Sequence, residues 1–445
     1  MKILLINTPR SPFNSILDYA PEEAKVFIHK KLIGPPLGLL TLAAAVNDYD
    51  VVVFDTKGEY DKNPNAPELS ELVKNLVNKH QPDIVGTTVI TSELYYGIEI
   101  LQVAKKIDPR ITTVIGGQYV TARLEECYDK SIDIAIQGHG GGKFRDVVTA
   151  KETNKAFESI AGIYLNDGKS FYKTKGVEKP WNAAGENFLL PDRKLIEPWR
   201  ETYRVKNAPS PTTYIFTSLG CPFKCTFCSI WKENCGKYYK RNIESIIAEL
   251  KSIDYDIVRF ADANTIVDIE FINSLFNRIE EEGIRKEYIM DIRADVAVNN
   301  PELIERLAKN GLKVVICGFE SYKEAELNKY NKDSSAAYIE KAIKLFHDNG
   351  IMLRGNYVIP VDYTPQDFRA MADYAGAHKV AYAGYTILTP MPGTVYYEQV
   401  KNSIVDNDLR KYNFFNAVLP TYLPVEDFYK EVGALWLIKK GTDVI

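Results

Sequence analysis

The sequence predicts an α/β protein in which an N-terminal doubly wound, Rossmann-like domain precedes a C-terminal partial (β/α)6 barrel. Short apolar runs alternate with helical patterns over residues 1–142 and again over residues 206–395. This alternation is typical of parallel sheets with helical crossovers. The chain has 445 residues, which is more than one typical domain contains. Its hydrophobic fraction of 45% is sufficient for complete cores in both regions.

Five strands are predicted in the N-terminal domain, at residues 2–6, 51–54, 84–88, 112–115 and 132–136. Helical patterns lie between them, at residues 38–46, 69–79, 93–106 and 122–129. A doubly wound sheet binds its ligands beyond the carboxyl ends of the strands. The residues that follow these strands are small, hydroxylated or glycine, so the backbone can come close to a large flat ligand there.

The second region is expected to begin after a connector at residues 143–205, which contains a small hairpin around Asn166-Asp167-Gly168. Six barrel strands are then predicted, at residues 214–217, 257–261, 288–292, 313–317, 353–358 and 382–388. Six strand–helix units are fewer than the eight of a closed barrel. Residues 396–445 are expected to form a helical cap that is rich in aromatic side chains.

Three cysteines follow the first barrel strand with the spacing C-x3-C-x2-C, at Cys221, Cys225 and Cys228. A [4Fe–4S] cluster normally takes four cysteines. Three thiolates would therefore hold three irons and leave one iron open to a ligand such as S-adenosylmethionine (SAM). Active sites of α/β barrels lie at this end of the strands. The alternative is a zinc site, to which Cys235 could contribute a fourth ligand.

Charge and cysteine content exclude several classes of protein. The net charge of −4 gives no basic surface for nucleic acid. Six cysteines without regular pairing predict a reducing compartment, and hence a cytoplasmic protein. The N-terminus is typical of a strand rather than of a signal peptide. The longest apolar stretch, residues 32–46, is interrupted by glycine and proline and is too short to span a membrane.

Taken together, these motifs make the chain similar to the cobalamin (B12)-binding radical-SAM enzymes, and in particular to their class B methylases. The cysteine motif matches the radical-SAM signature, and further barrel motifs follow in the family's order. They are Arg259-Phe260-Ala261-Asp262, Asp291-Ile292-Arg293, Gly318-Phe319-Glu320-Ser321, Asn356-Tyr357-Val358 and Pro390-Met391-Pro392-Gly393. The resemblance implies a [4Fe–4S] cluster, SAM and cobalamin as cofactors, and an electron donor such as ferredoxin or flavodoxin.

Within the barrel, the resemblance implies SAM contacts for four residues. These are Asp262, Arg293, Glu320 and Asn356. Alternatives stay open for three of them. Asp262 could instead hold a barrel loop, and Glu320 could form a structural salt bridge. Arg293 could pair with Asp291 or Asp295 rather than with the carboxylate of SAM.

In the N-terminal domain, the resemblance rests on Gly34-Pro35-Pro36-Leu37-Gly38 and on Ile115-Gly116-Gly117. It implies a set of cobalamin-binding residues: Thr8, Pro36, Gly38, Thr87, Thr88, Gly116, Gly117, Gln118, Tyr119, Gly138, His139 and Gly140. A Cβ at Gly117 is expected to intrude on the ligand, although a tight turn would also explain the glycine. The motif that supplies a histidine to cobalt in other B12 proteins is absent. Cobalamin is therefore expected to bind without a protein imidazole, and His139 could contact the cofactor or face solvent.

The resemblance also implies a reaction, namely methylation of an unactivated carbon. The 5′-deoxyadenosyl radical removes a hydrogen atom, and methylcobalamin delivers the methyl group. Two alternatives are a cobalamin-dependent cyclase or rearrangement enzyme, and a non-catalytic corrinoid carrier. A tRNA methylthiotransferase is disfavoured because only Cys127 precedes the motif. The substrate is left open between a small molecule, a lipid and a tetrapyrrole.

The cysteine motif gives a direct test. Anaerobically purified protein should carry about four irons per chain, and Cys225→Ala should lose both the cluster and SAM cleavage because two thiolates cannot hold it. Iron content and the visible absorbance of the cluster measure the effect. Cys127→Ala and Cys235→Ala serve as controls that should keep their iron. Loss of iron in Cys235→Ala would instead indicate a four-cysteine site.

Overall fold

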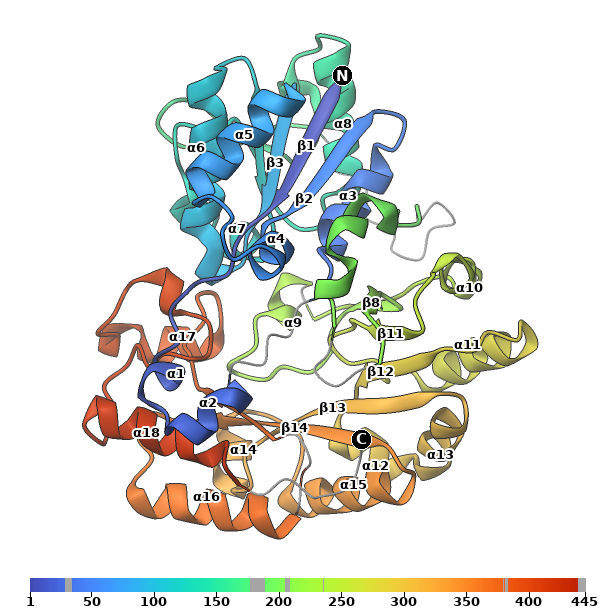
Figure 1. Ribbon diagram of the computed structural model, residues 1–445, viewed down its shortest axis with the longest axis vertical. Coiled ribbons are helices and arrows are strands. Elements are labelled where there is room, and N and C mark those ends of the chain that lie inside the picture. Colours follow the sequence, from blue (N-terminus) through green and yellow to red (C-terminus); the bar gives the residue numbers. More distant parts are fainter. Residues whose placement is uncertain are drawn as a thin grey trace. The chain divides into compact units, whose positions relative to one another are not determined.

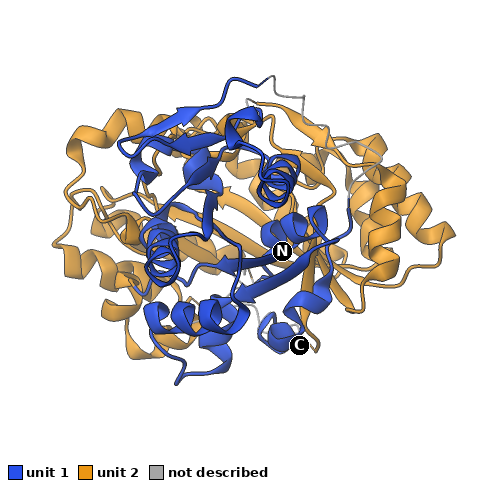
Figure 2. Cartoon of the chain, turned by 90° about the horizontal axis from the view of Figure 1, so that it is seen from above, with its two compact units in different colours: residues 1–12, 33–204 blue, residues 13–32, 205–445 orange. Residues whose placement is uncertain are grey.

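The computed structural model describes residues 1–28, 34–176, 189–204, 209–234, 236–378, 380 and 383–438. The chain forms two compact units (Figure 1, Figure 2). Unit 1 comprises Met1–Pro12 and Ile33–Arg204, and unit 2 comprises Phe13–Leu32 and Val205–Ile445. Figure 2 draws unit 1 in blue and unit 2 in orange. The chain thus enters unit 2 at residue 13, returns to unit 1 at residue 33, and leaves it again at residue 205.

Unit 1 is built on a sheet with the strand order β2-β1-β3-β4-β5-β6-β7. The first five strands in this order run parallel, and β6 and β7 add an antiparallel hairpin beyond β5. The bounds are β1 (Lys2–Asn7), β2 (Asp50–Asp55), β3 (Ile84–Thr88), β4 (Thr112–Gly116), β5 (Ile134–Ile136), β6 (Tyr164–Asn166) and β7 (Phe171–Lys173). The register pairs Asn7 with Asp55 and with Thr88. The polar residues that end these three strands therefore share one edge of the sheet.

Helices connect and cover these strands. The α-helices are α3 (Leu37–Ala45), α4 (Thr56–Lys62), α5 (Leu69–His80), α6 (Leu94–Ile107), α7 (Gln118–Ala122) and α8 (Gly141–Glu152). The 3-10 helices are η1 (Thr91–Glu93), η2 (Leu124–Cys127), η3 (Phe157–Ser159) and η4 (Arg193–Thr202). The inner part of β1, from Ile3 to Ile6, is almost fully buried. This burial on both faces is what helices on both sides of a parallel sheet require.

The structure differs from the sequence expectation in two places within unit 1. The helix expected at residues 122–129 is instead the short α7 followed by η2, and Arg123 between them is non-helical. Most of the region expected as a connector, residues 143–205, belongs to unit 1, which ends at Arg204. There α8 packs against α3, the hairpin extends the sheet beyond β5, and η4 packs against β2. Trp199 of η4, for example, packs edge-on against Phe54 of β2. The expected hairpin itself is confirmed.

Unit 2 contains a six-stranded parallel sheet with the order β15-β14-β13-β12-β11-β8. The bounds are β8 (Thr212–Ile215), β11 (Ile257–Phe260), β12 (Glu287–Asp291), β13 (Leu312–Glu320), β14 (Met352–Ile359) and β15 (Gly384–Ile387). Strands β8 and β15 lie at the two ends of this order, as in a partial barrel. The predicted start of the last strand at residue 382 lies outside the described residues.

Helices of unit 2 alternate with the strands (Figure 1). They are α9 (Ile230–Glu233), α10 (Ile243–Ser252), α11 (Ile269–Glu281), α12 (Ala294–Asn299), α13 (Pro301–Lys309), α14 (Glu324–Lys329), α15 (Ala336–Asp348), α16 (Pro365–His378), α17 (Val395–Val400) and α18 (Val425–Leu435). Strand β14 has a different environment on each of its two faces, because buried and half-buried residues alternate along its whole length. The buried set packs in the hydrophobic core with the helices. The half-buried set therefore lines the inner face of the partial barrel.

No helix in the described part of the chain is long and apolar enough to cross a membrane. Of the expected helical cap at residues 396–445, the structure describes residues 396–438, which contain most of α17 and all of α18. The segment between them is mostly irregular, with short 3-10 turns at Lys401–Ser403 and Leu409–Lys411.

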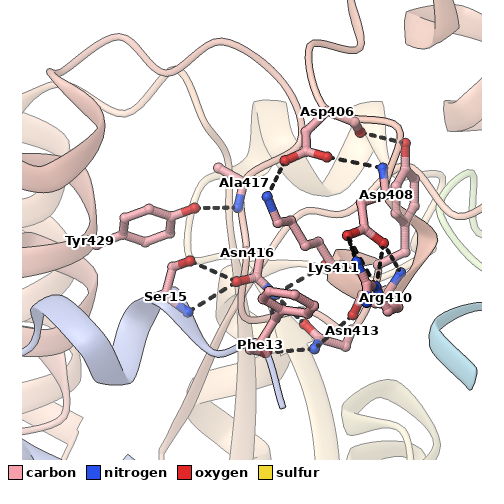
Figure 3. A network of polar contacts seen from close by, with 11 residues as sticks. Phe13, Ser15, Asp406, Asp408, Arg410, Lys411, Asn413, Asn416, Ala417 and Tyr429 are labelled. Carbon is pink, nitrogen blue, oxygen red and sulfur yellow. Dashed lines mark hydrogen bonds and ion pairs between the residues drawn. The ribbon is translucent and has the colours of Figure 1, made fainter. Parts of the chain in front are cut away.

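A segment from the start of the chain is part of unit 2. Helices α1 (Ser15–Tyr19) and α2 (Glu22–Ile28) pack against α18. Figure 3 shows how polar contacts hold this segment to the irregular C-terminal region. Asn416, which is 1% exposed, accepts hydrogen bonds from the backbone N–H and the hydroxyl of Ser15 at 3.0 and 2.8 Å. Its amide nitrogen donates to the carbonyls of Phe13 and Lys411.

The buried amide of Asn416 should matter for stability. Asn416→Ala removes the acceptor of the two Ser15 donors, while the Phe13 carbonyl keeps its hydrogen bond from the Asn413 amide. We expect the free energy of unfolding to fall by about 1–3 kcal/mol. Thermal unfolding and limited proteolysis of the first thirty residues measure this change. The matched control is Asn402→Ala on the exposed surface of the same unit, which should unfold like the wild type. Equal stability of the two variants would refute the role of the network.

Candidate active site

The three-cysteine loop begins and ends on a two-stranded ladder. Strand β9 (Ser218–Gly220) directly precedes Cys221, and it pairs antiparallel with β10 (Tyr238–Lys240). Gly220 has a φ of +84°, and a Cβ there would lie 2.2 Å from the carbonyl oxygen of Lys237. Only glycine fits this position. The ladder thus closes residues 221–237 into a defined loop at the carboxyl end of β8.

Asp262 holds the first residues of this ladder in place. Its carboxylate accepts hydrogen bonds from the backbone N–H groups of Thr217 and Ser218, both at 2.8 Å, and from the hydroxyl of Thr217. Asp262 is 3% exposed. Burial raises the pKa of Asp262 to about 6, against the effect of these three donors. Of the two roles considered for Asp262, the contacts are those of a loop anchor.

A buried ion pair secures the far end of the ladder. Arg241 pairs with Glu249 of α10, and both side chains are almost fully buried. The Arg241 guanidinium also donates to the carbonyl of Phe216 at 3.1 Å, and its backbone N–H donates to Thr217 at 2.9 Å. Both ends of the cysteine loop are therefore fixed to the barrel by buried polar contacts.

The tip of the loop rests on the segment that follows α14. The N–H of Thr226 donates to the carbonyl of Tyr330 at 2.9 Å, and the Asn331 amide donates to the carbonyl of Lys224 at 3.0 Å. Phe227 packs edge-on against the Tyr330 ring. Within the loop, the indole of Trp231 donates to the carbonyl of Cys225 at 3.0 Å. These contacts position the loop without using any cysteine thiol.

Arg293 joins the loop to the same segment. Its guanidinium lies 3.8 Å from the centre of the Phe223 ring, a cation–π contact. It donates to the carbonyls of Lys332 and Asp333 at 2.7 and 3.0 Å, and it pairs with Asp295 at 2.9 Å. The alternative in which Arg293 pairs with Asp295 is therefore the contact observed.

Glu320 ends β13 in a left-handed conformation, with a φ of +64°. A register shift in the pairing with β14 occurs at this point. The carboxylate pairs with the ammonium of Lys332 at 2.7 Å, and both side chains are 11% exposed. A Cβ at Gly318 would lie 2.3 Å from Glu320 Oε1 and 3.0 Å from Lys332 Nζ. The glycine two residues before Glu320 therefore leaves the space that this ion pair occupies.

Lys332 is a charged group at the site that sequence reasoning missed. Burial opposes its charge, but the neighbouring Glu320 and Cys225 hold the pKa of Lys332 above its ordinary value. Lys332 in turn counteracts the burial that raises the pKa of the Cys225 thiol. Its position twelve residues after Glu320 follows from the turn after α14, and no local motif marks it.

The thiols themselves are buried or half-buried. Cys225 is buried, while Cys221 and Cys228 are half-buried. Burial raises the pKa of Cys228 to about 12. Among the described residues, no three His, Cys, Asp or Glu side chains are grouped to hold a single metal ion. The donor set fits a cluster in which each thiolate binds a different iron; Cys235, the fourth ligand of the zinc alternative, lies outside the described residues.

Asn356 lies on the inner face of β14, where it is half-buried. A Cβ at Gly384 of the neighbouring strand would lie 2.8 Å from Asn356 Oδ1, so this glycine makes room for the amide. The part of the chain that the structure describes contains no hydrogen-bond partner for this side chain. The amide therefore faces the inside of the partial barrel with its donors and acceptor unused.

At the carboxyl edge of the unit 1 sheet, several predicted side chains bind each other. Thr8 is fully buried, and its hydroxyl donates to Glu93 Oε2 at 2.6 Å. Asn7 donates to Asp55 at 2.7 Å, and Thr87 donates to the carbonyl of Ile6 at 2.8 Å. Thr8 and Thr87 are therefore used within the protein, while Thr88 is half-buried at the same edge.

Packing within unit 1 accounts for the glycine at position 117, in the loop after β4. Gly117 has a φ of +110°, and a Cβ there would lie 2.5–2.6 Å from Thr88 Oγ1 and from the backbone of Val89. Packing inside unit 1 therefore requires glycine at this position. Tyr119 is 1% exposed, and its hydroxyl donates to Glu126. Gly116 and Gln118 are half-buried beside it.

Other glycines at this edge leave open space. We call Gly38, Gly138, Gly141 and Gly142 the glycine surface, because a Cβ at any of them meets nothing within 4 Å. They lie at the starts of α3 and α8 and in the loop before α8, and these two helices pack against each other. Pro36, His139 and Gly140 are half-buried in the same two loops. A surface of bare backbone fits a large planar group such as a corrin.

Comparison with known protein families also divides the chain into an N-terminal and a C-terminal domain. Residues 215–375 match the radical SAM superfamily, and residues 25–148 match the B12 binding domain. The structure is similar to that of the radical SAM methyltransferase TsrM from Kitasatospora setae, with a TM-score of 0.70 and 15% identity over 97% of this chain and 84% of that chain. This likeness supports the fold.

Three relatives are similar in sequence over most of this chain. An uncharacterized methyltransferase of Pyrococcus horikoshii is 27% identical over 87% of this chain and 83% of its own length. The hopanoid C-3 methylase of Methylococcus capsulatus is 24% identical over 92% and 76%. The anaerobic magnesium-protoporphyrin IX monomethyl ester cyclase of Cereibacter sphaeroides is 24% identical over 79% and 58%.

A B12-binding domain, a radical-SAM barrel and an intact three-cysteine loop define an enzyme that uses a [4Fe–4S] cluster, SAM and cobalamin. The chain thus combines a B12-binding domain with a domain of the radical SAM superfamily, and it is similar to relatives named as methyltransferases and to one named as a cyclase.

The anchor at Asp262 gives a testable effect on the cluster. Asp262→Ala removes the acceptor of two buried N–H groups, at a cost of about 1–3 kcal/mol for each unsatisfied donor. We expect this variant to lose most of its iron during purification, as measured by iron content per chain. Asp262→Asn keeps an acceptor oxygen and should retain its iron. Equal iron retention in the two variants would contradict the role of the carboxylate.

The pH dependence of protein stability supplies a second test of the role of Asp262. Its pKa rises from an ordinary 3.8 to about 6 on folding, so the folded state holds the proton more tightly than the unfolded state. This group's contribution to stability is therefore fully present below pH 3.8 and falls as the pH rises through about 6. Denaturant unfolding of Asp262→Asn should show a weaker loss of stability over that interval than the wild type shows.

Proposed function

We propose that this enzyme transfers a methyl group from SAM to an unactivated carbon of its substrate. The observation that carries the proposal is the union, in one chain, of the B12-binding unit and the three-cysteine barrel loop, in a branch whose relatives include methyltransferases. When bound, the cluster and SAM supply a carbon radical, and cobalamin supplies the methyl group. The protein's part is to bind, orient and shield these groups.

On the barrel side, each of Cys221, Cys225 and Cys228 is proposed to hold one iron. Lys332 lies close enough to Cys225 to counter the charge of the thiolates. Glu320 uses only Oε1 for Lys332, and its Oε2 has no hydrogen-bond partner among the described residues. We assign Oε2 to the amino group of SAM, because a carboxylate oxygen binds an ammonium strongly.

Asn356 is proposed to bind SAM as well, through its unused amide. Arg293 and Asp262 are proposed to act indirectly, by positioning other residues rather than by contacting SAM. Arg293 is fully engaged with Phe223, Asp295 and the backbone of residues 332–333, so its proposed task is to position the cysteine loop and Lys332 together. Asp262 does the same for the start of the loop.

On the unit 1 side, the glycine surface is proposed to take the corrin. Pro36, His139 and Gly140 border it, and Gly116, Gln118 and Thr88 lie on the same edge of the sheet. Thr8, Thr87, Tyr119 and Gly117 shape this edge from within, because their side chains or backbone conformations serve internal packing. Cobalamin is expected to bind without a protein imidazole at cobalt.

The alternative is cyclisation or rearrangement, which one relative's name supports. A test that needs no substrate separates the two. Reduced protein loaded with cobalamin and mixed with methyl-deuterated SAM should form S-adenosylhomocysteine, up to about one per cobalamin. Cobalamin-free protein should cleave SAM to 5′-deoxyadenosine without forming S-adenosylhomocysteine. Mass spectrometry quantifies both products, and 5′-deoxyadenosine alone from the loaded protein would favour the cyclase.

A bulky side chain placed in the glycine surface tests whether this surface binds the corrin. Gly38→Phe should fold normally, because a Cβ at this exposed helical position meets nothing. We expect the cobalamin affinity to fall by at least about tenfold, or 1.4 kcal/mol, as measured by cobalamin retention on gel filtration. Gly376→Phe is the matched control, an exposed helical glycine of unit 2, and it should retain cobalamin. Unchanged retention in Gly38→Phe would place the corrin elsewhere.

Two further parts belong to the proposal. Reduction of the cluster requires a one-electron donor, for which ferredoxin or flavodoxin is proposed. A cytoplasmic location is proposed as well, because the cluster and free thiols need a reducing compartment. For the substrate, a small molecule, a lipid or a tetrapyrrole is consistent with the names of the relatives.

A further inference from the structure

The inner face of the partial barrel carries an unbalanced charge below the proposed SAM site. Three charged residues lie near one another on the sheet: Arg259 on β11, Asp291 on β12 and Arg354 on β14. In the parallel register, Arg259 pairs with Ile289 of β12. Ile316 of β13 pairs with Asp291 on one side and with Arg354 on the other. Arg354 is half-buried and alternates with buried Leu353 and Gly355. It is therefore on the inner face, one inward position below Asn356.

Only one of the two arginines has an acidic partner. Arg259 pairs with Asp291 at 2.8 Å and lies over the ring of Tyr214 at 5.3 Å from its centre. For the Arg354 guanidinium, the described residues provide no hydrogen-bond acceptor and no ion-pair partner. Burial and the nearby Arg259 hold the pKa of Arg354 down, at about 10, while Asp291 acts in the opposite direction. Arg354 remains charged at neutral pH, in a group with two cations and one anion.

An uncompensated arginine inside a barrel is costly unless a ligand supplies the anion. Its guanidinium presents paired donors that match a carboxylate or a phosphate. The site is open to a ligand, since the side chains of Arg259 and Asp291 retain 21% and 23% exposure. Asn356, with its unused amide, lies directly above on the same strand. The two unpaired polar groups of β14 therefore face the same space.

We propose that Arg354, supported by the Arg259–Asp291 pair and Tyr214, binds an anionic group of the substrate, a carboxylate or a phosphate, inside the barrel. The inference rests on the proposed function, because it names a feature of the molecule that this site methylates. Arg354 fixes the charged end of the substrate, and the carbon to be methylated lies on the part that extends towards the cluster. Neutral lipids without an acidic group are disfavoured as substrates.

Small fluorinated probes test this without knowledge of the substrate. The line width of 4-fluorobenzoate in 19F spectra should increase on addition of the cluster-loaded, cobalamin-loaded enzyme at fixed ionic strength, whereas 4-fluorobenzamide should be unaffected. The probe 4-fluorophenyl phosphate distinguishes the two anions. Arg354→Gln should weaken binding of the preferred anion by about tenfold or more. Arg369→Gln, at an exposed position of α16, is the matched surface control and should bind as the wild type does.

A second variant covers the case in which Arg354→Gln does not fold. Arg354→Lys retains the charge but not the paired donors, and it should bind the anion more weakly than the wild type. Formation of S-adenosylhomocysteine without substrate is measured in the wild type, so a failure of the methylation proposal shows there, independently of the Arg354 variants. Anion binding that is equal in the wild type and in every Arg354 variant that folds, or binding that is equal for benzoate and benzamide, would overturn the inference.

Discussion

The buried carboxylate of Asp262 is the constraint on which the site depends. It binds two consecutive backbone N–H groups at the end of the first barrel strand, where a parallel sheet leaves such donors without partners. The carboxylate thereby fixes the position at which three features begin: the β9–β10 ladder, the turn at Gly220 and the cysteine loop. Burial of an acidic group is unfavourable in itself, and the raised pKa of Asp262 reflects this. The three donors offset that penalty only when the loop is in place.

Charge around the cysteines is arranged in nearly neutral pairs. Arg293 is balanced by Asp295, and Lys332 by Glu320. Both cations reach the cysteine loop, one through the Phe223 ring and the other near the Cys225 thiol. A set of thiolates and a cluster would bring additional negative charge to this region. The Lys332 ammonium and the Arg293 guanidinium therefore place positive charge near the cysteines before any cofactor binds.

The sequence predicted the fold class and the cysteine loop because both depend on local spacing. Strand and helix periodicity placed five strands in one region and six in the other, and the spacing of Cys221, Cys225 and Cys228 identified the cluster loop. Lys332 was missed because its approach to Glu320 depends on how the turn after α14 folds back. The packing role of Gly117 was missed for the same reason, since the atoms that exclude a Cβ come from residues 88 and 89.

Long-range association also limited the prediction of domain limits. Residues 13–28 precede most of unit 1 in the chain, yet they pack with α18 of unit 2. No helix was predicted at these residues, and their local pattern does not indicate which core they join. Asn416, four hundred residues away, provides the hydrogen bonds that hold this segment. No periodicity in either segment points to the other.

The central claim is that three cysteines hold a cluster with one iron open to SAM. Electron paramagnetic resonance of the reduced protein, recorded with and without SAM, tests it most directly. The account predicts a signal of a reduced [4Fe–4S] cluster whose g values change on addition of SAM, because SAM binds the open iron. A cluster signal that SAM leaves unchanged, or reduced protein with no cluster signal, would contradict the claim.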